Sequence, residues 1–253
     1  MPVVLQAGLW GLVGGSALLI GVALGWYIDF PRRIVAGIMA FGAGVLISAL
    51  SFELMDEAWE RAGIVPVAIG FLIGAVAFTG CNHLLGYWGA RHRKRSLGCK
   101  RHEDKIENPG NGSALALGAL LDGIPESIVI GVSLLKGGAV GWVAVVAVFL
   151  SNLPEGLSSA AGMRKDGKSA AFVFGLWGSI ALVAGISAAL GFTLFADAPP
   201  SVIAAVQAIA AGAILAMIVD TMVPEAFEGT HDFAGLIAVA GFLTAFAFSK
   251  LAG

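Results

Sequence analysis

"SALALGALLDGIPESIVIGVSLL", residues 113–135, is an apolar run with two carboxylates and a proline at its centre. A helix that spans a bilayer needs about 20 mainly apolar residues, so this run is long enough to cross one. Asp122 and Glu126 are four residues apart and share one face of a helix. Pro125 cannot donate a backbone hydrogen bond, which frees the carbonyl oxygen of Leu121. The run therefore predicts a spanning helix with oxygen ligands at mid-depth.

The rest of the chain has the same apolar character. Of its 253 residues, 58% are hydrophobic and 13% are charged, with a mean hydropathy of +0.88, which is too apolar for a soluble domain. Continuously apolar runs rich in Gly and Ala favour helices over the alternating strands of a membrane barrel. We predict an all-α integral membrane protein, one transmembrane domain over 1–253. Its eight helices are expected at about 5–28, 34–55, 64–88, 113–135, 139–162, 170–195, 201–223 and 233–252.

The fifth predicted helix carries a related motif, "FLSNLPEG" (149–156). Ser151 and Glu155 have the same four-residue spacing, and Pro154 again loosens the backbone between them. A charged side chain at the centre of a bilayer costs about 2.5–3.5 kcal/mol or more. No Lys or Arg lies in the central part of any predicted helix. A bound divalent cation would supply the missing charge.

The predicted metal ligands are therefore the oxygen groups of the two motifs, Asp122, Glu126, Ser151 and Glu155. Carboxylate, hydroxyl and carbonyl oxygens suit hard divalent cations such as manganese better than they suit zinc. The alternative is that the carboxylates are protonated and hydrogen-bonded at helix kinks. Further polar residues are candidates for a cation pathway: Glu53, Asn152, and Asp220 with Glu225. The alternative, that they are solvated residues at helix ends, has about equal weight.

The basic residues predict the orientation. Loops 29–33, 89–112 and 163–169 hold twelve of the fifteen Lys and Arg residues. Basic loops face the cytoplasm, so both termini should face outward, N-out and C-out. The loop 89–112 is then cytoplasmic. Its His92, Cys99 and His102 could trap metal, although a solvated basic linker is the favoured interpretation.

Two stretches of the chain resemble each other: "AFGAGVLISALSFELMDEAWE" (40–60) and "AIAAGAILAMIVDTMVPEAFE" (208–228). Six of 21 positions match without gaps. On the predicted topology the second and seventh helices run in opposite directions, which indicates an inverted repeat of the kind that secondary transporters contain. Glycine pairs four residues apart predict close helix packing: Gly11/Gly15, Gly21/Gly25 and Gly70/Gly74.

The chain resembles the ZIP family of divalent metal transporters. In that family the fourth helix usually reads His-Asn-x-Pro-Glu and the fifth His-Glu-x-Pro-His/Glu, and here "DGIPE" (122–126) and "SNLPE" (151–155) stand in those helices. The resemblance covers essentially the whole chain and implies that helices four and five carry the metal, with an elevator-like movement. Asp122 and Ser151 stand where the family has His. The sixth helix, 170–195, has no ionisable group to complete a second metal site.

The sequence thus predicts a transporter of divalent cations, with Zn, Mn, Fe or Cd as the substrate ion. One alternative is an intramembrane metal-dependent hydrolase, which is disfavoured because such an enzyme usually needs His ligands and only His83 of the four histidines lies within a predicted helix. The other is a transporter of another solute that uses the carboxylates for proton coupling. An enzyme is not expected. The expected partners are the lipid bilayer and metal ions, with a homodimer left open and no nucleic acid. The expected location is the plasma membrane, or the inner membrane of a bacterium.

Overall fold

The regular structure of the chain is helical. The computed structural model describes residues 1–87, 111–135 and 140–252, and in these ranges it contains helices and no strand. The all-α prediction is confirmed for this part of the chain. The elements are Val3–Tyr27 (α1), Arg32–Ala49 (α2), Leu50–Met55 (η1), Asp56–Ala62 (α3), Ile64–Tyr87 (α4), Asn111–Ser133 (α5), Trp142–Lys165 (α6), Ala170–Phe195 (α7), Pro200–Met217 (α8), Ile218–Met222 (η3), Val223–Thr230 (α9), His231–Phe233 (η4) and Ala234–Ala252 (α10).

Six segments of the described residues are long and apolar enough to cross a membrane. The last of them contains both the seventh and the eighth predicted helix. Most of the predicted loop 89–112, with His92, Cys99 and His102, lies outside the described residues. The last two positions of the predicted loop, 111 and 112, belong to α5. The six segments are Val3–Tyr27, Arg32–Ala62, Ile64–Leu85, Trp142–Lys165, Ala170–Phe195 and Pro200–Leu251.

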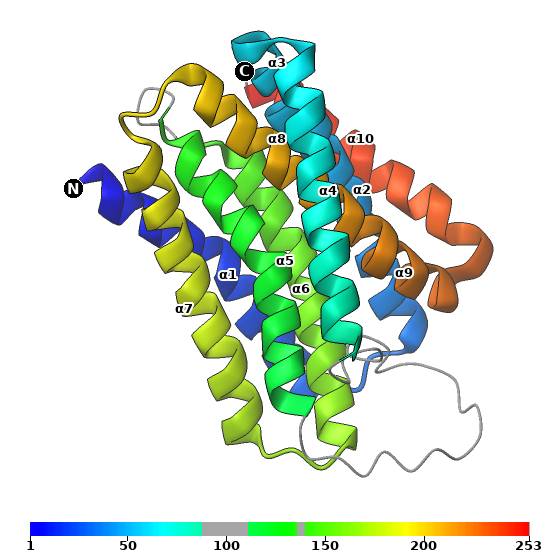
Figure 1. The fold of residues 1–253 in the computed structure, drawn as a ribbon. Coiled ribbons are helices and arrows are strands. Elements are labelled where there is room, and N and C mark those ends of the chain that lie inside the picture. The colour runs from blue at the N-terminus through cyan, green and yellow to red at the C-terminus, as the bar shows by residue number, and fades with distance from the viewer. Residues whose placement is uncertain (88–110, 136–139, 253) are drawn as a thin grey trace.

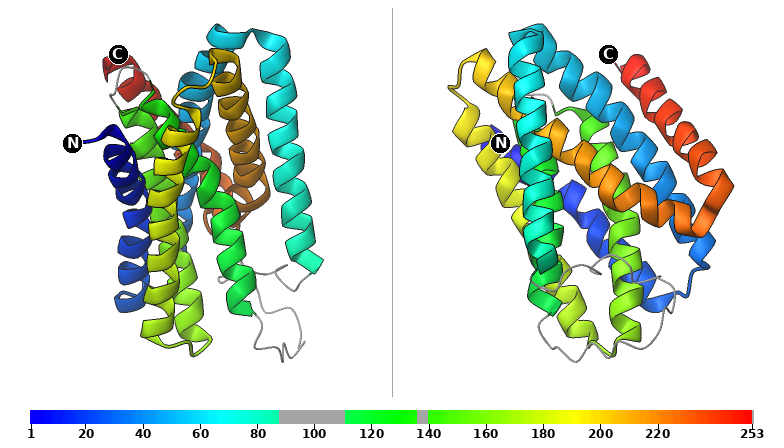
Figure 2. Two further views of the ribbon diagram at one scale, coloured as in Figure 1. Left: turned by 60° about the vertical axis from the view of Figure 1, so that its left-hand side comes forward. Right: turned by 45° about the vertical axis from the view of Figure 1, so that its right-hand side comes forward.

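Local signals explain several helix ends. Ser169 caps α7, since its hydroxyl oxygen accepts a hydrogen bond from the backbone N–H of Phe172. Gly63 ends α3 at a φ of 74°, a conformation that glycine adopts without a steric penalty. His231 ends α9 at a φ of 47°, and the chain then turns back into α10 (Figure 1). Both termini lie toward the same end of the bundle (Figure 2).

One set of helices, which we call the α1 bundle, consists of α1, α5, α6 and α7. Within it α1 packs against α6 and α7, and α5 packs against α7. A side chain at Gly21 or Gly25 would overlap backbone atoms of α6, and one at Gly11 would lie 2.6 Å from the Cβ atom of Ala188 in α7. Gly131 brings α5 equally close to α7. The predicted glycine seams of α1 are confirmed.

The second set, the α2 bundle, contains α2, α4, α8 and α10 with the short helices α3 and α9. Here α2 packs against α10 and α4 packs against α8. A side chain at Gly44 of α2 would overlap the carbonyl oxygen of Ala238 in α10, and one at Gly212 of α8 would overlap that of Phe71 in α4. Gly74 of the predicted third seam contacts the backbone of Ile209 in the same way.

Gly44 and Gly212 occupy equivalent positions in the aligned stretches 40–60 and 208–228. The α2 and α8 helices run in opposite directions (Figure 1). Each also changes to a π-helix at the same aligned position, at Leu50 in η1 and at Ile218 in η3. A π turn accommodates an extra residue and is often found at functional sites. The packing and the π segments therefore repeat together, in opposite orientations.

Candidate cation site

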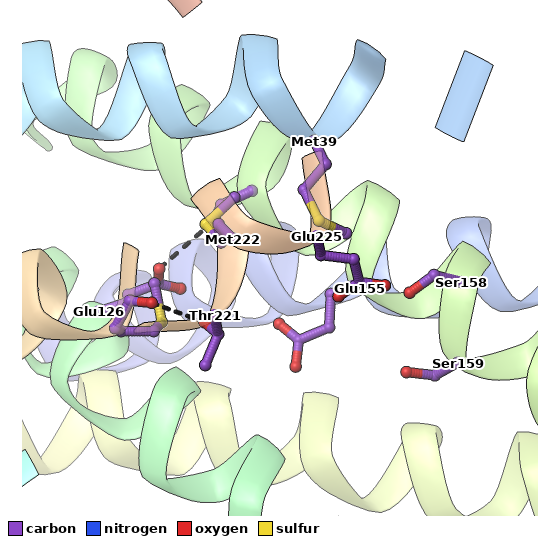
Figure 3. A pocket seen from close by; sticks show the side chains of 10 residues that line it. Met39, Glu126, Glu155, Ser158, Ser159, Thr221, Met222 and Glu225 are labelled. Carbon is purple, nitrogen blue, oxygen red and sulfur yellow. Dashed lines mark hydrogen bonds between the residues drawn. The ribbon is translucent and has the colours of Figure 1, made fainter. Parts of the chain in front are cut away.

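A small cavity lies where the two bundles meet. Its volume is about 20 Å³, and a cavity that holds one water molecule needs only about 10–15 Å³ on this measure. It therefore has room for a single ion and none for a larger organic solute. We call it the glutamate pocket (Figure 3). Its lining comes from α2, α5, α6, α8, η3 and α9, through Met39, Glu126, Ser151, Glu155, Ser158, Ser159, Met217, Thr221, Met222 and Glu225.

The structure brings three of the four predicted metal ligands into this pocket, namely Glu126, Ser151 and Glu155. The Ser151 Oγ atom lies 2.9 Å from the Val148 carbonyl oxygen of its own helix and 3.4 Å from the Glu126 Oε1 atom of α5, so the single hydroxyl proton is shared between two acceptors. Asp122 does not line the pocket. Its side chain is 3% exposed and lies one helical turn before Glu126 in α5. Pro125 and Pro154 remain inside continuous helices.

The predicted pathway residues lie in three different places. The Asn152 side-chain amide donates to the Gly14 carbonyl oxygen of α1 at 3.1 Å. Asp220 is exposed in η3 and is absent from the lining of the pocket. Glu53 accepts a hydrogen bond from the Ser249 hydroxyl at 2.6 Å and lines another cavity. Only Glu225, which the sequence paired with Asp220, lies in the glutamate pocket.

The second cavity, the η1 cavity, has a volume of about 250 Å³. Its acidic residues are Glu53 and Glu57, and Gln207 and Ser133 add further polar groups. The Arg61 guanidinium pairs with the Glu57 Oε1 atom at 2.5 Å. Glu57 is the aligned equivalent of Glu225 in the internal repeat. The two halves of the repeat thus contribute corresponding glutamates to two different cavities.

A third cavity, which we call the apolar constriction, shares lining residues with both of these cavities. It holds about 20 Å³, and its lining is aliphatic except for Glu126. Glu126 is shared with the glutamate pocket, whereas Leu54, Val129 and Ala144 are shared with the η1 cavity. Glu126 therefore stands where the polar pocket meets the apolar constriction, with 2% of its surface exposed.

The ionisable residues that line the pocket are all acidic. Glu126, Glu155 and Glu225 line it, and none of its lining residues among those described is a Lys, Arg or His. Glu126 is buried, whereas Glu155 and Glu225 are half-buried. A carboxylate taken out of water costs several kcal/mol unless positive charge or protons compensate. The hydroxyls of Ser151, Ser158 and Thr221 add neutral oxygens. The pocket therefore offers oxygen atoms from both bundles, although among the described residues no three His, Cys, Asp or Glu side chains lie close enough together to hold a metal ion as they stand.

Three methionines of the pocket were not predicted. Met217 ends α8, Met222 is the last residue of η3, and Met39 comes from α2, a helix far away in sequence from the two carboxylate motifs. No local pattern marks them, because their position depends on how the α2 bundle packs against α5 and α6.

Known proteins with similar sequences were compared with the chain. No family model matches it. The chain is 30% identical over 229 residues to the zinc transporter ZupT of Salmonella newport (strain SL254), with 86% of this chain and 85% of that protein covered. The ZupT protein of Salmonella heidelberg (strain SL476) is also 30% identical, with the same coverage. The zinc transporter ZIP11 of Bos taurus is 26% identical over 217 residues, and the match covers 65% of this chain and 61% of that protein.

Proposed function

Because the chain belongs to the ZIP family of divalent metal transporters, we propose that it carries a divalent cation across a membrane through the glutamate pocket. Zinc is the proposed first substrate, since the similar ZupT and ZIP11 proteins are named zinc transporters. Manganese, iron and cadmium are the other candidate ions from the sequence. The observation that carries the proposal is that Glu126, Glu155 and Glu225, from three different helices, line one cavity of single-ion size.

The residues have distinct proposed roles. Glu126 and Glu155 are the charged ligands from the α1 bundle, and Ser151 holds the Glu126 carboxylate through its hydroxyl. Glu225 is the charged ligand from the α2 bundle. Asp122 lies one turn away in α5, where it is a ligand for a neighbouring position on the same path. A cation that leaves the pocket past Glu126 would reach the apolar constriction and then Glu53 in the η1 cavity.

The size of the glutamate pocket argues against placing the substrate of either rival function in it. As it stands in this structure, a cavity of about 20 Å³ has no room for an organic solute. A hydrolytic metal site would need an open coordination position beside its fixed ligands, together with room for a substrate. The lipid bilayer and the transported ion are then the partners, in the plasma membrane or the inner membrane of a bacterium. Association of two copies stays a proposal that cross-linking in native membranes would test.

The direct test of the proposed function is uptake of radioactive zinc into proteoliposomes that contain the purified chain. We expect uptake that saturates with zinc concentration and that exceeds uptake by protein-free liposomes. Inhibition of zinc uptake by unlabelled cadmium and by unlabelled manganese then ranks these ions as substrates. Uptake equal to that of protein-free liposomes for every divalent ion would refute the proposal.

We further propose eight membrane crossings with both termini outside, which adds α5 to the six apolar segments and divides the last of them at η4. Asp166 and Asp197 are exposed at opposite ends of α7 and suit a labelling test. In a chain whose two cysteines are replaced by Ser, Asp166→Cys should react with an impermeant maleimide only from the cytoplasmic side. Asp197→Cys should react only from outside. The opposite pattern would reverse the proposed orientation.

A further inference from the structure

Three of the six methionines of the chain line the glutamate pocket. Met39, Met217 and Met222 are buried, with 4%, 4% and 7% of their surfaces exposed. Figure 3 shows the side chains of Met39 and Met222 extending among those of Glu126, Glu155 and Glu225. Thioether sulfur is therefore available at a cavity whose other ligand atoms are oxygens.

The sulfur atoms of the pocket come from one bundle alone, whereas its oxygen atoms come from both, since Thr221 and Glu225 belong to η3 and α9. The α5 and α6 helices contribute only oxygen groups, through Glu126, Ser151 and Glu155 with the neighbouring serines. All three sulfurs come from α2, α8 and η3 of the α2 bundle. A cation in the pocket thus lies between an oxygen face and a face that contains sulfur.

The chemistry of the thioether decides which ions gain from this arrangement. Thioether is a soft ligand that selects soft cations, whereas carboxylate and hydroxyl oxygens suit hard ions such as manganese and magnesium. We propose that Met39, Met217 and Met222 form a thioether subsite that makes the pocket prefer soft cations, cadmium and silver(I), over manganese. This inference rests on the proposed function, because it assigns the ion class of the same pocket.

Methionine also fills irregular gaps in apolar cores, which is the competing explanation of the three residues. Met163 provides the contrast within this chain. It is buried to a similar extent, with 7% of its surface exposed, but it packs with Leu18, Val22 and Trp177 in the apolar core of the α1 bundle. The pocket methionines instead line a cavity together with three glutamates.

The experiment replaces methionine with leucine, which conserves volume and apolar character and costs less than about 1.5 kcal/mol of stability in most cores. Binding of radioactive cadmium and of silver(I) to the full chain in nanodiscs is measured, and manganese is titrated as the competitor. In the Met39→Leu/Met222→Leu double variant, affinity for cadmium and silver(I) should fall about tenfold or more. Loss of residues that only support metal ligands already lowers metal affinity about tenfold. Affinity for manganese should stay within about twofold, since its oxygen ligands are intact.

Two comparison variants make the result decisive. Met163→Leu should bind all three ions as the wild type does, whereas Glu155→Gln should lose cadmium and manganese together and retain most silver(I) binding. A double methionine variant with the wild-type ratio of cadmium to manganese affinity would overturn the thioether subsite. Retention of cadmium and manganese binding by Glu155→Gln would overturn the proposed function instead, so the two failures are distinguishable.

Discussion

Replacing Glu126 with Gln is expected to abolish transport of every divalent ion. The substitution keeps the shape of the side chain and removes its charge at the point where the glutamate pocket meets the apolar constriction. Breaking a buried charge pair costs about 3 kcal/mol or more, which corresponds to about a hundredfold loss of affinity. Zinc binding to the purified variant and zinc flux into proteoliposomes measure the two effects separately.

Folding of the Glu126→Gln variant should not suffer. Without a bound cation the wild type has three glutamates around one pocket, Glu126 buried and Glu155 and Glu225 half-buried, and Gln at position 126 removes the need to keep a charge out of water there. Thermal unfolding in the absence of metal should therefore occur at the same or a higher temperature, whereas added zinc should no longer stabilise the variant.

Asp122→Asn is the matched comparison, because Asp122 is equally buried in α5 but does not line the pocket. We expect a loss of zinc affinity smaller than that of Glu126→Gln. A larger loss in Asp122→Asn would move the principal site one helical turn along α5.

Replacing Gly44 with Val is expected to prevent folding of the chain. The new side chain would overlap the backbone carbonyl of Ala238, and no change of rotamer can move a backbone atom away. Overpacking of a core by side-chain atoms costs about 1–3 kcal/mol, and a collision with backbone belongs at or above the upper end of that range. The yield of monodisperse protein in detergent and its unfolding temperature are the measurements.

Gly80→Ala is the control for this experiment. Gly80 lies within α4, and a Cβ atom added there meets nothing within 4 Å. Alanine is the better helix former by about 1 kcal/mol, so this variant should be as stable as the wild type or slightly more stable. If Gly44→Val matched it in yield and stability, α2 and α10 would have to be able to separate without loss of the fold.

The helices could be predicted from the sequence because each has a continuous apolar run that only a membrane-spanning helix satisfies. The predicted ends were less accurate at two points. The helix that begins with α2 continues from the predicted end at 55 to Ala62, and the helix that begins with α8 continues from 223 to Thr230. In both cases a π segment carries the helix past the apolar run into a charged stretch.

The site could be predicted in part. A four-residue spacing placed Ser151 and Glu155 on one face of α6, and the structure has both in the glutamate pocket. The same spacing was expected to bring Asp122 beside Glu126. Glu126 is, however, the one residue that α5 contributes to the pocket, whereas α6 runs along it and contributes Ser151, Glu155, Ser158 and Ser159. The positions of Met39, Met217 and Met222 in the pocket depend on contacts between distant helices. The residue spacing within one helix carries no information about such contacts.

The glycine contacts between helices bear on how the repeated chain arose. If α1 to α4 are taken as one half of the repeat and α7 to α10 as the other, the glycine contacts of the α2 bundle join the two halves: α2 packs against α10, and α4 packs against α8. A single half, taken alone, would have two glycine-lined faces with nothing to cover them. If the repeat arose by gene duplication, the ancestral half-length protein could have been stable only as a pair of copies inserted into the membrane in opposite directions. Fusion of the two copies would then have converted an assembly that depended on concentration into one that forms within a single chain.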